Sequence, residues 1–177
     1  MADTKISALT AYTLPKTTDV VPASDGSGNP KKITVEDLRG YAALSSGAAV
    51  TSTTLVDLAG MSIALTAGTW VFSMLLSGSS STGAGGKFGV QYSGTATVNA
   101  TFQGQTSTTG FAATARITSL NTGSTTMGTT TSAQTANLIF GELVATTSGN
   151  LTARALKVTS GTLTVDASSW MRAFRVA

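Results

Sequence analysis

Short runs in which apolar and polar residues alternate occupy most of this 177-residue sequence, and clusters of Gly, Ser and Thr separate them. Between residues 69 and 77, for example, Trp70, Phe72 and Met74 stand at every second position. A spacing of two residues places side chains on one face of a β-strand, whereas an amphipathic helix needs a repeat of about 3.6 residues. No segment carries a long helical repeat. The sequence therefore predicts an all-β protein.

The expected strands are short and regularly spaced, an arrangement typical of a β-sandwich or a barrel. The uncharged run 58–77 is about 20 residues long, the length of a membrane-spanning helix, but its Gly and Thr residues make it only weakly apolar. We interpret it as strands joined by a turn at 66–68. Strands are expected at 53–58, 62–65, 69–77, 87–93, 95–103, 112–119, 136–146, 150–159, 162–165 and 169–176.

The distribution of charge divides the chain into two parts. Residues 1–41 contain 10 charged residues and all three prolines, whereas residues 42–177 contain 9 charged residues. The stretch after residue 41 is rich in Ala, Ser and Gly, a composition typical of flexible linkers. We therefore expect an N-terminal attachment arm at 1–41, a linker at 42–52 and a β-sandwich domain at 53–177. The N-terminal residues lack the pattern of a secretory leader.

Within the arm, turn-forming residues separate two short apolar runs. We expect the runs 20–23 and 32–35 to form a β-hairpin, followed by a short helix at 35–41. The turn between them holds Asp25, Ser27 and Asn29 at a spacing that also suits calcium. A calcium loop would carry more carboxylates, so we interpret the segment as a plain turn.

The arm has too few large apolar residues to bury a core of its own. Its apolar side chains therefore need a surface outside the segment. They can pack on the second part of the chain, or they can dock on another protein, which the intervening linker favours. The residues predicted to bind such a partner are Ile6, Leu9, Tyr12, Leu14, Val20, Val21, Ile33, Val35 and Leu38.

The residue types that carry most enzymatic chemistry are scarce. The chain has no Cys and no His, which excludes histidine bases, Ser-His-Asp triads, disulfides and Cys/His metal sites. The carboxylates of the second part are Asp57, Glu142 and Asp166, and the glycine-rich stretch 83–87 lacks the flanking residues of a phosphate-binding loop. The net charge of +3 comes without a basic stripe, which disfavours nucleic acid. We expect no enzyme activity, no cofactor and no metal ion.

Aromatic and large aliphatic residues of the second part fall on the expected strands. We interpret them as the core and the interface between subunits, with a platform for stacking sugar rings as the alternative. This set comprises Trp70, Phe72, Leu75, Phe140, Leu143, Trp170 and Phe174.

The arm resembles the attachment segments of tailed-bacteriophage fibre and head-decoration proteins. The stretches that carry this resemblance are 6–9, 19–22 and 32–38. The resemblance implies a protein of the virion that binds the major capsid protein or another virion protein.

The second part resembles the trimeric jelly-roll domain of the tumour-necrosis-factor and complement type, as found on phage virions. The stretches that carry this resemblance are 68–73, 143–146, 151–155 and 169–176. The resemblance implies an antiparallel jelly-roll sandwich and a homotrimer whose aromatic and aliphatic residues meet at the threefold axis. Oligomerisation also suits a domain of small residues, because it adds buried area.

Together these features predict a capsid decoration protein, made in the host cytoplasm, that binds the assembled shell as a trimer and stabilises it. The alternative is a receptor-binding tip of a tail fibre, which would bind a host glycan or protein through loops at 78–86, 103–110 and 121–132. We expect neither a nucleic acid nor a membrane as a partner.

Overall fold

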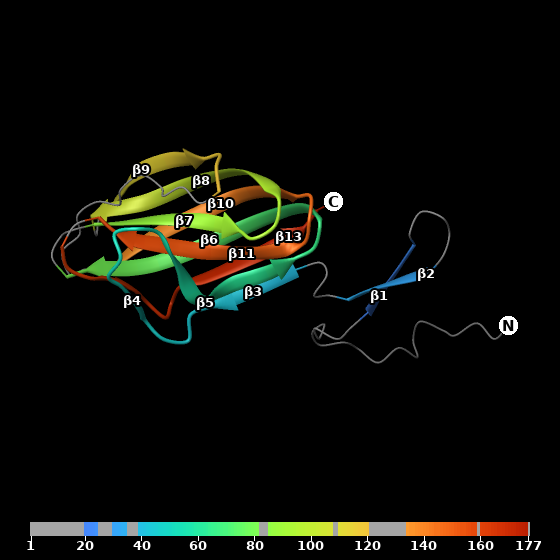
Figure 1. Cartoon of the computed structure of the whole chain (residues 1–177), viewed down its shortest axis with the longest axis horizontal. Coiled ribbons are helices and arrows are strands. Elements are labelled where there is room, and N and C mark those ends of the chain that lie inside the picture. The colour runs from blue at the N-terminus through green and yellow to red at the C-terminus, as the bar shows by residue number, and fades with distance from the viewer. Residues whose placement is uncertain are drawn as a thin grey trace. The chain divides into compact units, whose positions relative to one another are not determined.

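The computed structural model describes residues 20–24, 30–34, 39–81, 85–107, 110–120, 134–158 and 160–176. All regular secondary structure within these ranges is β-strand (Figure 1). The chain divides into two compact units, Met1–Leu38 and Arg39–Ala177. The all-β class predicted from the alternating pattern is therefore confirmed.

The first unit contains a β-hairpin. Strand β1 (Val20–Ser24) pairs antiparallel with β2 (Pro30–Thr34), with Val20 opposite Thr34 and Val21 opposite Ile33. The hairpin expected from the turn-forming residues is confirmed. The candidate calcium ligands of its turn lie outside the described residues.

The larger sheet of the second unit has eight antiparallel strands. Six of them form a continuous order, β3-β13-β6-β10-β8-β9, and β12 bridges the far end of β6 to β4. The strands are β3 (Arg39–Ala43), β4 (Ala48–Val50), β6 (Gly68–Ser80), β8 (Ala96–Ser107), β9 (Gly110–Ile117), β10 (Thr135–Ala145), β12 (Leu163–Val165) and β13 (Trp170–Arg175).

A three-stranded sheet has the order β5-β11-β7. Its strands are β5 (Val56–Leu65), β11 (Gly149–Lys157) and β7 (Gly86–Tyr92). The register of β5 against β11 shifts between Thr152 and Arg154. Gly60 lies in the extra segment of β5 with a φ of 86°, a left-handed conformation that glycine adopts without strain.

The core lies between these two sheets and follows the period of two. On β6, Trp70, Phe72, Met74 and Leu76 are fully buried, and the intervening residues lie on the other face. The Trp70 indole nitrogen donates a hydrogen bond to the Thr66 carbonyl at 3.0 Å, which ties β6 to the turn before it. The predicted antiparallel sandwich is confirmed, and jelly-roll connectivity stays a prediction.

The start of the sandwich differs from the expected linker and helix. Residues 39–43 and 48–50 form strands that pair with β13 and β12, so residues 39–41 are not helical. Ala42, Leu44 and Val50 join the buried core, and a Cβ atom at Gly40 would overlap the side chain of Ile63. The small residues of this stretch thus allow close packing of strands. The unit boundary accordingly lies after Leu38.

Tyr92, at the end of β7, contacts three of the segments that connect strands of the sandwich. Its hydroxyl donates to the carbonyl of Thr147 at 2.7 Å and lies 3.3 Å from the carbonyl of Leu65. The ring covers Gly94 and Gly149, where an added Cβ would lie 2.8 and 3.0 Å from ring carbons. Burial raises the pKa of the Tyr92 hydroxyl, because a phenolate would lose its hydration there.

Candidate interaction surface

The outer face of the eight-stranded sheet carries an exposed apolar patch. The period of two places every second residue of each strand on this face, opposite the core. All the large apolar side chains that the described residues expose lie here. They are Tyr41, Val71, Phe140, Val144, Phe174 and Val176, with exposed fractions of 70, 45, 38, 37, 45 and 59%. We call these six residues the apolar patch.

Strand pairing brings the patch together from distant parts of the sequence. β13 lies between β3 and β6, and β10 lies on the other side of β6. The Val176 amide donates to the Thr69 carbonyl at 2.9 Å, which continues the pairing of β13 with β6. One row across the sheet runs Tyr41, Arg172, Ser73, Phe140, Thr101, and the next runs Phe174, Val71, Glu142, Asn99.

Arg172 lies within the β13 side of the patch. Its guanidinium carbon is 5.1 Å from the centre of the Trp170 ring and 5.7 Å from that of Phe174. Its Nε donates to the Ser73 hydroxyl at 3.0 Å. A guanidinium over aromatic rings is stabilised by the ring quadrupole. This packing fixes the Arg172 side chain against the face.

Glu142 lies on the β10 side of the same face. It is exposed, and among the described residues it has no ion-pair partner. β6 separates it from Arg172, and the β6 positions on this face are Val71, Ser73 and Leu75, all uncharged. Within the patch region, Arg172 and Glu142 thus lie on either side of uncharged β6 positions.

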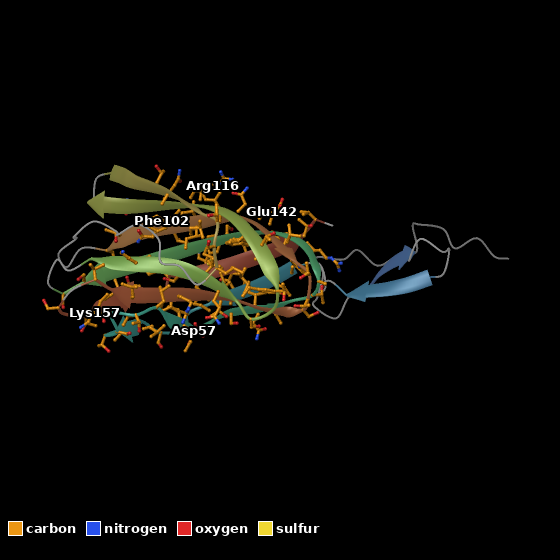
Figure 2. The ribbon with its side chains drawn as sticks, turned by 45° about the horizontal axis from the view of Figure 1, so that its top comes forward. Asp57, Phe102, Arg116, Glu142 and Lys157 are labelled. Carbon is orange, nitrogen blue, oxygen red and sulfur yellow. The ribbon has the colours of Figure 1, made fainter. Side chains whose placement is uncertain are left out.

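Beyond β10, the face becomes polar. Thr101 and Asn99 occupy the face on β8, and Arg116 on β9 donates from Nε to the Asn99 side-chain oxygen at 3.0 Å. Figure 2 shows Arg116 and Glu142 on the same side of the sandwich. An apolar centre bordered by polar residues is the usual arrangement of a protein interface.

The outer face of the three-stranded sheet has a different character. Asp57 and Arg154 form an ion pair, with Oδ1 and Nε 2.7 Å apart. The hydroxyls of Ser62 and Thr152 lie 2.9 Å apart, across the pairing of β5 with β11. In Figure 2, Asp57 and Lys157 lie on the side opposite Glu142. The outer face of the three-stranded sheet is thus polar, whereas that of the eight-stranded sheet carries the apolar patch.

The predicted core and interface residues divide between the two faces of the large sheet. Trp70, Phe72 and Leu143 are buried in the core. Phe140 and Phe174 are exposed on the outer face, and Leu75 and Trp170 are half-buried there. Their grouping as an oligomer interface stays a prediction.

Other patch residues were missed by the sequence interpretation. Val71 and Val144 lie on the same strands as predicted residues, and Val176 directly follows β13. The period of two places all three on the face of Phe140 and Phe174. Tyr41 carries no such signal, because the sequence predicts a short helix at 35–41.

The residues proposed for the arm carry less structural information. Val20, Val21 and Ile33 lie on the β1–β2 hairpin by their backbone. The expected loop 121–132 lies outside the described residues. The remaining arm residues do so as well, namely Ile6, Leu9, Tyr12, Leu14, Val35 and Leu38.

Two of the loops assigned to the alternative receptor-binding function include strand residues. Residues 78–80 belong to β6 and pair with β12. Residues 103–107 belong to β8 and pair with β9. These residues are therefore strand and not loop, because polar Gly, Ser and Thr residues also occupy strands in this protein.

The candidate catalytic carboxylates lie apart. Asp57 and Glu142 are on opposite outer faces of a sandwich whose sheets are about 10 Å apart. The Asp166 side chain accepts a hydrogen bond from the Ser77 hydroxyl at 3.5 Å. The described residues contain no cluster of three potential metal ligands, and no helix long and apolar enough to span a membrane. The absence of enzyme activity stays a prediction.

Comparison with known proteins gives weak structural matches. No protein-family model matches the chain, and no curated protein does so. A crystal structure of the infectious bursal disease virus VP2 subviral particle matches at 13% identity and a TM-score of 0.23, covering 97% of this chain and 46% of that chain. A structure of the Gx strain of the same virus matches at 13% identity and a TM-score of 0.19, covering 97% and 45%. The chain thus spans under half the length of these proteins.

Proposed function

We propose that this chain is a structural protein of a virus particle, a decoration protein whose N-terminal unit attaches it to the assembled shell. The observation that carries the proposal is the division into a short unit, 1–38, and a β-sandwich, 39–177, that has its own core. The resemblance of the first unit to phage attachment segments supports its assignment to the shell contact.

The core of the sandwich supports the assignment of attachment to the N-terminal unit. Every described core residue lies between Ala42 and Ala173, within the second unit. The hairpin of that unit pairs Val21 with Ile33. A two-stranded hairpin is marginally stable alone, and docking on another protein would give its apolar residues a surface.

Binding of this kind stabilises the shell by mass action. A protein that binds the assembled shell and not the separated subunits shifts the equilibrium toward assembly. In a homotrimer three arms would bind together, and their linkage raises the avidity above that of one arm. Each arm contact can therefore be weak while the trimer stays bound.

Cosedimentation with virus particles that lack the protein tests this function. We expect the full chain to bind, and a chain lacking residues 1–38 to stay folded and unbound. Ile33→Asp in the full chain should weaken binding at least tenfold, because a buried unpaired carboxylate is costly. Lys32→Asp, the neighbouring position in β2, serves as the matched control. Undiminished binding of the truncated chain would refute the attachment role of the N-terminal unit.

A further inference from the structure

We propose that the apolar patch binds a second copy of this chain, with the β13 side of one patch against the β10 side of the next. Three copies would then form a closed ring, with β6 of each copy facing the threefold axis. The inference rests on the homotrimer of the proposed function, and it names the surface that forms the trimer.

The size of the patch fits an oligomer interface. At about 4.8 Å between strands and about 3.3 Å per residue, the four strands β3, β13, β6 and β10 over the positions 170–176 cover about 400 Å². Large patches on soluble monomers reach about 300–600 Å² and are commonly functional. Stable interfaces bury about 800 Å² per partner. The patch therefore supplies an apolar centre, and the polar residues of β8 and β9 supply the rim.

Two opposite charges that flank the centre of the face fit another copy of the same face. Arg172 lies on the β13 side, Glu142 lies on the β10 side, and the β6 positions between them are uncharged. When copies surround an axis, the β13 side of each faces the β10 side of the next. Arg172 of one copy would then meet Glu142 of its neighbour, and this contact repeats until the ring closes.

The chemistry of the patch favours protein over sugar as its occupant. Val71, Val144 and Val176 are aliphatic, and branched aliphatic side chains offer a sugar neither a stacking plane nor a hydrogen bond. The Arg172 guanidinium already covers the Trp170 and Phe174 rings at 5.1 and 5.7 Å. A protein surface that buries both the aliphatic groups and this cation fits the patch.

Charge exchange in the full chain tests the interface. Sedimentation velocity and native mass spectrometry would give the mass of the wild-type protein, Arg172→Glu, Glu142→Arg and the double variant that combines both. We expect a wild-type trimer, at least tenfold weaker association of each single variant, and recovery in the double variant. Val71→Asp, at the centre of the patch, should also dissociate the trimer.

Control variants place equal changes on the polar outer face. Lys87→Glu on β7 and Ala64→Asp on β5 match Arg172→Glu and Val71→Asp, and both should remain trimers. The far-ultraviolet circular dichroism of each variant checks that it is folded. A wild-type monomer or dimer, or single variants that associate like wild type, would overturn the interface.

A parallel particle-binding assay separates this inference from the proposed function. A wild-type monomer that still cosediments with particles would overturn the interface and leave the shell-binding function standing. A trimer that Arg172→Glu dissociates, and that never binds particles, would support the interface and refute the shell-binding function.

Discussion

Replacing Tyr92 by Phe removes one hydroxyl from a side chain that contacts two backbone carbonyls. The hydroxyl donates to the Thr147 carbonyl at 2.7 Å and lies near the Leu65 carbonyl. The ring itself stays over Gly94 and Gly149. Tyr92→Phe therefore tests the hydrogen bond apart from the packing.

The expected cost follows from the burial of the site. Tyr92 is 4% exposed, so water cannot readily replace the lost donor. Removing one partner of a buried hydrogen bond costs about 1–2 kcal/mol. With a urea dependence of about 2 kcal/mol per molar, the unfolding midpoint should fall by about 0.5–1 M.

The pH dependence gives a second readout. The Tyr92 hydroxyl has a pKa near 10.0 in the unfolded chain and a raised pKa in the folded protein. Above pH 10 the unfolded chain has lost this proton while the folded protein keeps it, so the free energy of unfolding falls as pH rises toward the folded pKa. Below pH 10 both states hold the proton, and this contribution is complete. The Phe variant cannot titrate here and should lose less stability between pH 10 and 11.

Urea unfolding followed by circular dichroism, at one fixed protein concentration, measures both effects. Thr53→Val is the control, because it removes a hydroxyl from an exposed side chain outside the apolar patch. A Tyr92→Phe midpoint equal to that of wild type at pH 7, with the same alkaline loss, would show that the hydroxyl contributes nothing to stability.

Two further substitutions test the sheet packing and the polar outer face. Gly141→Ala would place a Cβ against the β8 backbone at Ala100, so we expect a loss of about 1–3 kcal/mol in thermal unfolding; a melting temperature equal to that of wild type would contradict this close approach. Asp57→Asn breaks the ion pair with Arg154, but Asp57 is 56% exposed, so chemical unfolding should show a change below about 1 kcal/mol. A larger loss would mean that the pair contributes more than an ordinary surface ion pair.

The strands of the sandwich could be predicted from the sequence because their signal is local. The expected ranges 69–77 and 87–93 correspond to β6 (Gly68–Ser80) and β7 (Gly86–Tyr92). The strands β3 and β4 could not be predicted in this way. They consist mostly of Ala and Gly, and their partners β13 and β12 lie more than 100 residues away in sequence.

The apolar patch could be predicted only in part. The alternation of Trp170, Arg172 and Phe174 places them on one face, but both faces of β6 carry large apolar residues, such as Trp70 and Val71. Which set faces the core is decided by the position of the three-stranded sheet. That information comes from non-local packing, and the sequence pattern does not contain it.

Immunogold labelling of purified virus particles, with an antibody raised against residues 39–177, tests the central claim most directly. The shell-decoration account predicts gold distributed over the surface of the head, lost from particles whose chain lacks residues 1–38. Gold confined to a tail tip, or particles without label, would contradict it.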